Sequence, residues 1–297
     1  MRDGSMHSSI RYGVGKRMRS IEQRVGRKLL KWLLAGSIAA AAAGCATPPP
    51  WGEFPVRTVP EGWAPEWREA APGIDYAFCS GGTLPPFHVV RVDLKTAAVT
   101  LPPPFARGKE ASELLQQYPD ATGIVNGTPF RIRRESGERR MEPVGVWIAG
   151  GRRYSRQEEQ WGVLWYDARA ERARVTKGRV EGAPARWAAG GFLPIVEEGK
   201  NVGIHDERHA RLAAGTAREG TLLYFLLIEG EALGQQGATS RETAQVMLRL
   251  GVQEALNLDG GRSATLLLRD ASGILLAEAA SGRKSLPCFI LLRSGGR

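Results

Sequence analysis

Short apolar runs separated by glycine and proline recur along the chain from residue 74 onward, and this spacing most limits what the chain can fold into. The runs are three to eight residues long, which suits strands and is too short for most helices. Residues 87–94 end in an alternation of apolar and polar side chains, which is typical of a strand with one buried face. We expect strands at 87–94, 123–125, 144–148, 161–166, 222–228, 255–258, 264–268 and 288–292.

Two segments are typical of helices instead. The first, 109–118, ends directly before a proline, where a helix is expected to stop. The second, 239–250, begins with Thr239 and Glu242 at the spacing of a capping box. It is followed by Gly251, which stands where a C-cap glycine belongs.

This balance of elements predicts an α+β fold, a strand-dominated single domain with a few helices, over residues 74–297. The preceding residues, 45–73, hold seven of the 18 prolines and are expected to form an extended Pro-rich tether. Its tryptophans, Trp51, Trp63 and Trp67, indicate that the later part of the tether packs on another surface, of which the domain is one candidate.

The charge of the chain is concentrated at its start. With 41 Lys and Arg against 31 Asp and Glu, the net charge is +10, a value that invites a nucleic-acid or membrane partner. Residues 1–31 contain nine basic and two acidic side chains, a net charge of +7. The apolar run 32–43 that follows is too short to cross a bilayer, which is the layout of a signal peptide. Without residues 1–44 the charge is +3, which argues against a nucleic-acid partner.

The end of this leader resembles the lipobox of bacterial lipoproteins, because Ala43 and Gly44 precede Cys45. The resemblance implies cleavage after residue 44 and lipid attachment at Cys45. The protein would then be exported and anchored to the bacterial cell envelope, on the periplasmic side of the outer or inner membrane. The alternative is a cytosolic amphipathic anchor helix with a chance cysteine, and a start at Met18 would give a more typical leader.

Two further cysteines, Cys79 and Cys288, remain in the mature chain. An exported protein lies where disulfides form, whereas free cysteines are commonly buried. A bridge between the two and a pair of separate buried thiols are both open at this point. No Cys/His spacing typical of zinc and no calcium-loop pattern is present.

Small and polar residues gather at three predicted strand ends: 125–130, 208–215 and 255–266. The dipeptides Asn126-Gly127 and Asp259-Gly260 taken alone indicate hairpin turns, since both tolerate positive φ.

The third of these segments also suits a ligand site. Asn257 and Asp259 are two residues apart, so that on a strand their side chains share one face. Gly260 and Gly261 let a ligand approach the backbone, and Ser263 adds a hydroxyl. This arrangement is typical of a carbohydrate or phosphate site.

The run ALNLDGGRSATLLL at 255–268, preceded by SRETAQVMLRLG at 240–251, resembles the C-terminal signature of the phosphodiester glycosidase family. Three further segments resemble the family in the same order: VNGTPF (125–130), AAGGFLPIVEEGK (188–200) and RHARLAAG (208–215). Arg262 stands where the family usually has a third glycine. The resemblance covers about 123–292 and implies hydrolysis of a sugar-1-phosphodiester bond in an envelope or exported glycan.

Roles for individual residues follow from this resemblance. Asp259 would act as the carboxylate at the anomeric carbon, with Asn126 and Asn257 holding sugar hydroxyls or orienting Asp259. The cations expected to neutralise the phosphate are Arg208, Arg211 and Arg262. The remaining substrate contacts are expected from Gly127, Gly260, Gly261 and Ser263.

No cofactor and no metal are expected, although Asp259 with Asn126 could hold a divalent ion. His88 is expected to be structural, whereas His205 and His209 could serve as an acid or a metal pair instead of surface residues. The alternative function is a non-catalytic envelope lipoprotein that binds an anionic glycan or cell-wall polymer in the same pocket.

Overall fold

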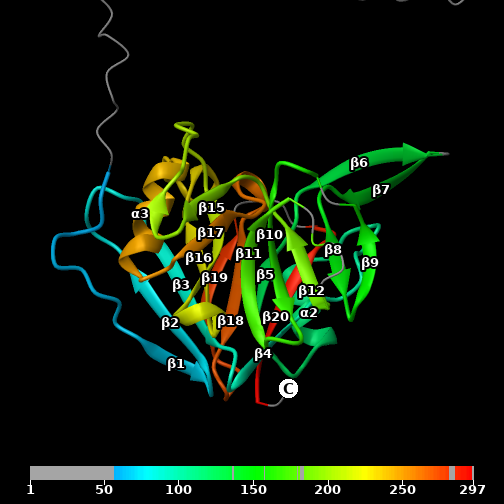
Figure 1. The fold of residues 1–297 in the computed structure, drawn as a ribbon, viewed down its shortest axis with the longest axis horizontal. Coiled ribbons are helices and arrows are strands. Elements are labelled where there is room, and N and C mark those ends of the chain that lie inside the picture. Colours follow the sequence, from blue (N-terminus) through cyan, green and yellow to red (C-terminus); the bar gives the residue numbers. More distant parts are fainter. Residues whose placement is uncertain are drawn as a thin grey trace, which may run out of the picture. The chain divides into compact units, whose positions relative to one another are not determined.

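Antiparallel strands dominate the computed structural model, as the short apolar runs predict (Figure 1). The structure describes residues 57–135, 137–156, 158–178, 180, 184–280 and 285–295. The expected signal peptide, the lipid site at Cys45 and the first part of the tether lie outside the described residues.

Eight strands form the large sheet, in the order β1-β2-β3-β16-β15-β17-β13-β14. Their bounds are β1 Arg68–Ala71, β2 Ile74–Cys79, β3 Phe87–Asp93, β13 Pro194–Glu197, β14 Lys200–Asn201, β15 Arg211–Ala217, β16 Leu222–Ile228 and β17 Glu254–Asn257. Because β17 pairs with β15 and β13, the run that carries the family signature enters at the middle of this sheet.

Two five-stranded sheets and one hairpin complete the strands. The second sheet, β11-β10-β12-β8-β9, consists of β8 Trp147–Ala149, β9 Arg152–Ser155, β10 Gly162–Asp167, β11 Arg172–Lys177 and β12 Ala185–Gly190. The third sheet, β19-β18-β5-β20-β4, consists of β4 Ala97–Thr100, β5 Ala121–Asn126, β18 Thr265–Arg269, β19 Leu275–Ala280 and β20 Phe289–Ser294. The hairpin pairs β6 Phe130–Glu135 with β7 Glu138–Pro143.

The main hydrophobic core lies where the three sheets face one another. Side chains from all three sheets meet there, including Phe225 of the large sheet, Trp147 of the second and Ile290 of the third, each at most 1% exposed. Burial of large side chains such as these is the main source of folding free energy. The three sheets are therefore one cooperative unit held by a shared core.

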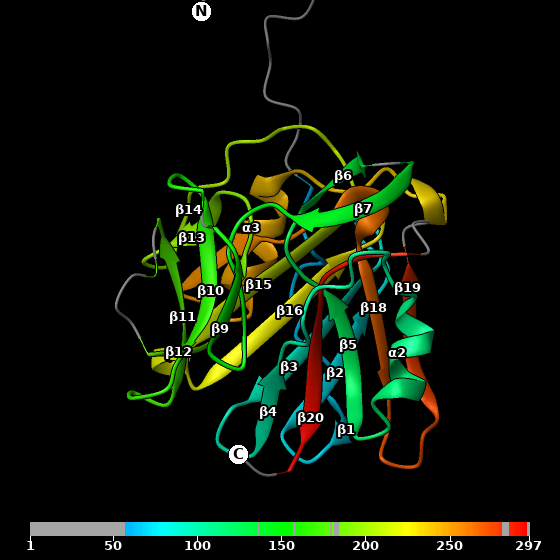
Figure 2. The ribbon, with the colours of Figure 1, turned by 90° about the vertical axis from the view of Figure 1, so that its right-hand side faces the viewer.

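Helices cover the outer faces of two sheets. Helix α3 (Ser240–Arg249) packs on the large sheet, and α2 (Ala111–Gln117) packs on the third sheet (Figure 2). Of three 3-10 turns, η1 (Arg218–Gly220) and η3 (Gly261–Ser263) connect strands, and η2 (Glu231–Leu233) lies between β16 and α3. The capping box predicted for α3 is confirmed, and Gly251 follows the helix with a φ of +77°.

The later part of the tether packs on the domain. Trp63 lies against Phe87 with ring centroids 5.2 Å apart, and Arg91 stacks on Trp67 at 4.3 Å. Strand β1, which also belongs to the predicted tether, pairs with β2 in the large sheet. The folded unit therefore takes in chain well before residue 74.

Cys79 and Cys288 are free and buried, in agreement with one of the two alternatives from the sequence. Cys79 ends β2 in the large sheet, whereas Cys288 directly precedes β20 in the third. Within the described ranges, no helix is long and apolar enough to span a membrane.

Candidate functional site

Asn126, the last residue of β5, ties two distant segments together. Its side-chain nitrogen donates to the backbone carbonyl of Asp259 at 2.7 Å, and its side-chain oxygen accepts from the backbone N–H of Thr265 at 2.8 Å. The residue is 2% exposed. Asn126 thus fixes both ends of the loop that carries the Asp-Gly-Gly run.

Backbone hydrogen bonds bring the three predicted segments to one place. The N–H of Asp259 donates to the carbonyl of Gly127 at 3.1 Å, and the N–H of Gly261 donates to the carbonyl of Ala210 at 2.7 Å. The loop after β17 is therefore held between the end of β5 and the start of β15. Sequence segments separated by more than a hundred residues form one site.

Neither glycine dipeptide forms a hairpin turn, so this interpretation of the sequence is wrong. Asn126-Gly127 stands at the end of β5, whose partners β18 and β20 are not the next strand in the chain. A glycine is required at 127 because a Cβ there would lie 2.6 Å from the Trp147 ring. At Gly260, φ is −100° and a Cβ would lie 2.7 Å from the carbonyl of Ala210. Close packing explains both glycines.

Gly261 differs from these two. Its φ is +54°, and a Cβ there would meet nothing within 4 Å. The neighbouring side chain of Arg262 is exposed, whereas Ser263 is 5% exposed. The η3 turn therefore presents open backbone and one cation to solvent and keeps its hydroxyl inside.

The carboxylate of Asp259 lies in the loop beyond the end of β17 and is partly exposed. Burial, helped by the negative charge of Asp259, raises the pKa of the Cys288 thiol well above its usual value. The backbone agrees with this proximity, because Gly127 accepts from the N–H of Asp259 and donates its own N–H to the carbonyl of Cys288 at 3.0 Å. Asp259 is thus a partly exposed carboxylate in the loop that connects the large sheet to the third.

Asn257 carries an unused acceptor. The residue is 4% exposed, and its side-chain oxygen has no hydrogen-bond partner among the described residues. A buried acceptor left unpaired costs about 1–3 kcal/mol. On the same sheet face, Ala213 is directly opposite Asn257 and Arg211 is the diagonal neighbour. The face therefore combines an unpaired acceptor with a cation.

Arg211 is held by backbone carbonyls. Its Nε donates to the carbonyl of Ala238 at 2.8 Å, and its Nη2 donates to the carbonyl of Glu207. Burial lowers the pKa of this guanidinium from its usual value, but a shift from so high a value leaves it charged at neutral pH. Of its five N–H donors, only two are used in these bonds, so the group is oriented and still able to bind an anion.

Arg208 is engaged in an ion pair that the sequence did not indicate. Its Nη1 lies 2.9 and 2.7 Å from the two carboxylate oxygens of Glu242 in α3, and Nε of Arg57 lies 3.2 Å from the same carboxylate. The Glu242 side chain is 1% exposed. Two guanidinium groups thus share one carboxylate, which leaves a net charge of +1 at the start of the helix.

Glu242 also completes the capping box, by accepting from the backbone N–H of Thr239 at 2.9 Å. Burial on its own would raise the pKa of this carboxyl, but hydrogen bonds from Arg57, Thr239 and Arg208 outweigh it and hold the pKa below its usual value. The spacing of Thr239 and Glu242 predicts that Glu242 caps the helix, but it does not predict the ion pairs of Glu242 with the two arginines.

His88 is structural, as expected. It is 7% exposed, with Nδ1 2.9 Å from the Tyr76 hydroxyl and Nε2 3.2 Å from Glu229. Burial, aided by the charge of Glu229, raises the pKa of Tyr76 to about 12. The other two histidines do not form a pair: the backbone of His205 bonds Ser240, and the exposed His209 lies 3.4 Å from Glu231.

In the part of the chain that the structure describes, no three His, Cys, Asp or Glu side chains gather as a metal site would require. That the protein needs no cofactor stays a prediction.

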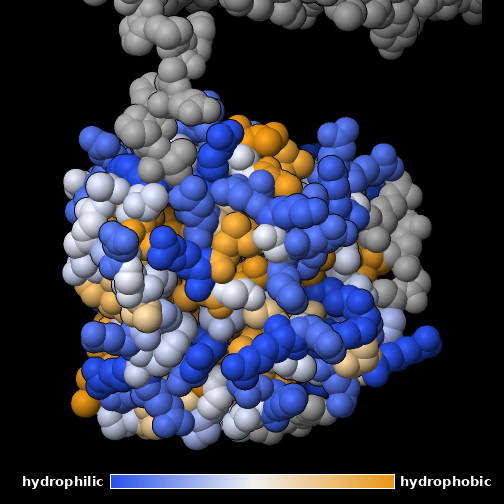
Figure 3. Space-filling view, turned by 60° about the vertical axis from the view of Figure 1, so that its left-hand side comes forward, coloured by the Kyte–Doolittle hydropathy of each residue, from blue (hydrophilic) through white to orange (hydrophobic). Residues whose placement is uncertain are grey.

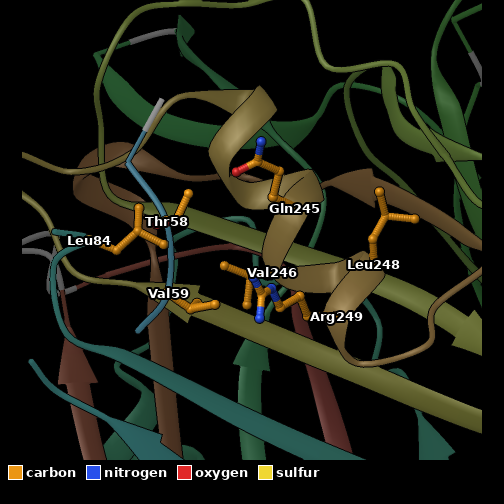
Figure 4. A pocket seen from close by; sticks show the side chains of 7 residues that line it. All are labelled: Thr58, Val59, Leu84, Gln245, Val246, Leu248 and Arg249. Carbon is orange, nitrogen blue, oxygen red and sulfur yellow. The ribbon is translucent and has the colours of Figure 1, made fainter. Parts of the chain in front are cut away.

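A cavity of about 250 Å³ lies elsewhere, between the segment at Thr58 and Val59 and the side of α3 (Figure 4). Leu84, Val246 and Leu248 make it largely apolar, and it contains none of the predicted site residues. Figure 3 shows apolar residues, in orange, exposed between hydrophilic ones on one side of the molecule. Thr58, Gln245 and Arg249 add polar groups to the lining of the cavity, but the cavity lies apart from the three segments that converge at Asn126.

The strand-rich fold brings asparagine, carboxylate and guanidinium groups from three distant segments to one place. A family model described as phosphodiester glycosidase matches residues 120–291, which include every segment that converges on the site. The chain belongs to the phosphodiester glycosidase family, as its motifs predict.

Solved structures share the fold at low sequence identity. The catalytic domain of zebrafish N-acetylglucosamine-1-phosphodiester alpha-N-acetylglucosaminidase, auto-inhibited by its pro-peptide, aligns with a TM-score of 0.54 and 17% identity over 81% of this chain and 87% of that one. A hypothetical protein from Synechocystis aligns with a TM-score of 0.58 and 13% identity over 78% of this chain and 64% of that one. A Burkholderia pseudomallei protein described as a putative exported protein aligns with a TM-score of 0.52 and 15% identity over 72% of this chain and 75% of that one. No curated protein matches the chain.

Proposed function

We propose that this protein hydrolyses a glycosyl phosphodiester, in which a phosphate joins the anomeric carbon of a sugar to a second group. The observation that carries the proposal is the pair of hydrogen bonds by which Asn126 holds the Asp259 loop beside the strand of Arg211. A carboxylate and a cation on adjoining segments are what cleavage beside a phosphate requires. The named activity of the zebrafish relative supports the same substrate class.

In the proposed reaction, the bond between the sugar C1 and the phosphate oxygen breaks. The phosphate leaves with the bonding electron pair as a monoester, and water supplies the hydroxyl at C1 and releases one proton. Asp259 would stabilise the positive charge that develops at C1, either as the nucleophile or as the base for water. A phosphate monoester is a good leaving group, so that a second carboxylic acid is not needed to protonate it.

The cations of the site have different parts in this proposal. Arg211, oriented by two carbonyls, would bind the phosphate through its remaining N–H groups, and the exposed Arg262 would approach it from solvent. Arg208 would act less directly, because its contacts go to Glu242. Asn257, with its unpaired oxygen, would accept a hydrogen bond from a sugar hydroxyl.

The location is part of the same proposal. The lipobox-like end of the leader supports export and a lipid anchor at Cys45, so the substrate would be a glycan of the cell envelope or an exported one. Neither a metal nor another cofactor takes part in the proposed step.

The full-length protein, incubated with an activated glycosyl phosphodiester, tests the proposal by the release of free sugar and phosphate monoester. Asp259→Asn keeps the size of the side chain and removes the charge, so release should stop while the protein still folds. Full turnover by this variant would remove Asp259 from the mechanism. Binding of the substrate without turnover by the unaltered protein would favour the glycan-binding alternative instead.

A further inference from the structure

The hairpin formed by β6 and β7 is the most basic exposed feature of the described chain outside the site. It stands apart from the three sheets and points away from them (Figure 1). Residues 131–140 include five arginines and two glutamates. The arginine side chains are exposed, although they belong to a regular two-stranded ribbon.

The register of the ribbon sets like charges against each other. Arg133 is directly opposite Arg140, and Arg134 is directly opposite Arg139. Like charges at facing positions destabilise an antiparallel pair, and a two-stranded ribbon on its own is marginally stable in water. The stability of the ribbon therefore does not explain these facing arginines, whereas a bound anion would reduce the repulsion between them.

Ion pairs within the hairpin neutralise only part of this charge. Glu142 contacts both Arg131 and Arg133, at 3.0 and 2.9 Å. For Arg134 and Arg139, no ion pair with any described residue is present. These two guanidinium groups lie on the same face of the ribbon and are available to a ligand.

A groove of about 500 Å³ lies at the base of the hairpin. Arg131, Glu142, Tyr154 and Arg156 line it, together with the backbone at Gly145. Glu158 also lines the groove, so that two arginines face two glutamates and the groove has no net charge. Its phenol, charged side chains and exposed backbone suit the hydroxyl groups of a sugar unit, and the arginines of the hairpin beyond it suit a phosphate.

The groove and the hairpin are joined to the proposed active site by a short stretch of backbone. Only three residues separate Asn126 from the start of β6. The N–H of Val144, in the groove, donates to the carbonyl of Pro129 at 2.7 Å, and the hydroxyl of Thr128 donates to the carbonyl of Gly190, next to Gly145. The groove and the hairpin therefore follow directly on the segment that ends at Asn126, both along the chain and through these hydrogen bonds.

We propose that the groove and the arginines of the β6–β7 hairpin bind the anionic continuation of a polymeric substrate, a glycan whose units are joined by phosphodiesters. This inference rests on the proposed function and names the substrate class for it. Successive phosphates would approach the guanidinium groups as the chain leaves the site. An anionic membrane surface would also attract arginines, but the continuity with the site favours the polymer.

The test compares a poly(glycosyl phosphate) with a p-nitrophenyl glycosyl phosphodiester as substrates. The double variant R134Q/R139Q should raise KM for the polymer about five- to tenfold, because two exposed phosphate contacts are lost, and leave kcat unchanged. KM for the small substrate should not change. The control K95Q/K200Q removes two exposed lysines, one in the turn after β3 and one in β14, and the same charge, and should leave both KM values within about twofold.

An equal effect of R134Q/R139Q on both substrates, or no effect on either, would overturn the inference. So would loss of binding to phosphatidylglycerol vesicles with an unchanged KM for the polymer, which would assign the hairpin to a membrane.

If neither substrate is hydrolysed by the unaltered protein, the proposed function fails separately. Binding of the fluorescently labelled polymer then tests the hairpin alone. Weaker binding by R134Q/R139Q than by the control supports the inference, and equal binding contradicts it.

Discussion

The side-chain amide of Asn126 spans 133 positions of sequence to hold the backbone carbonyl of Asp259 at 2.7 Å. Its oxygen at the same time accepts from Thr265. One buried residue therefore positions the loop that carries the proposed carboxylate, without using the carboxylate itself. The position of the Asp259 backbone depends on these contacts and on the bond from its own N–H to Gly127.

Replacement of Asn126 by alanine should lower both stability and turnover. Two buried backbone groups would lose their partners, and we expect the free energy of unfolding to fall by about 2–4 kcal/mol, measured by urea denaturation. The matched control is Asn201→Ala. Asn201 makes the same two kinds of bond, to Arg241 and Gly203, but is exposed, so its loss should cost under about 1 kcal/mol. Equal losses in the two variants would contradict the role given to Asn126.

Arg211→Lys should weaken binding of phosphate-bearing substrates. Lysine keeps the charge but loses the planar donors that two carbonyls orient, so KM for a glycosyl phosphodiester should rise about tenfold or more. Hydrolysis of a neutral glycoside with the same sugar, if the protein shows any, should change much less. An equal loss on both substrates would count against a phosphate contact.

The ion cluster at the start of α3 should make stability depend on pH. The folded-state pKa of Glu242 is lowered, so its contribution is fully present above the ordinary value of 4.5 and is lost as the pH falls through the lower folded value. Urea unfolding at pH 7 and at successive values below 4.5 measures this slope. The variant E242Q should be less stable at pH 7 and lose less on acidification. A slope identical to that of the unaltered protein would contradict this assignment.

Both cysteines of the domain should be present as unreactive thiols in the folded protein. Cys79 and Cys288 are 5% and 2% exposed, and burial raises the pKa of each thiol, so the reactive thiolate is disfavoured. Mass spectrometry should find the same mass with and without reductant. Iodoacetamide should label both residues only after unfolding, and rapid labelling of native Cys288 would contradict its burial beside Asp259.

Local patterns made most of the fold predictable. The strand at 222–228 is an unbroken apolar run, and it forms β16 over the same residues. The capping box at Thr239 and Glu242 fixed the start of α3 for a similar reason, since its signal lies within four residues. Both predictions depend on interactions between near neighbours in sequence.

The site was predictable in its residues but not in its contacts. Nothing local to Arg208 indicates that it shares the carboxylate of Glu242 with Arg57, because Glu242 lies 34 positions from Arg208 and 185 positions from Arg57. The basic hairpin was missed because β6 and β7 have no apolar run: a ribbon outside the core needs none. The contacts of Arg208 and the position of the hairpin both depend on residues far apart in sequence. Local patterns in a single sequence do not reveal such contacts.

The β6–β7 hairpin shares no strand with the three sheets, and three residues join it to the end of β5. Its sequence is therefore freed from the packing that constrains the rest of the chain. Substrate preference can diverge through this appendage while the bond-breaking residues stay in place. Exchange of the hairpin between relatives would be a simple route to new specificities on one unaltered scaffold.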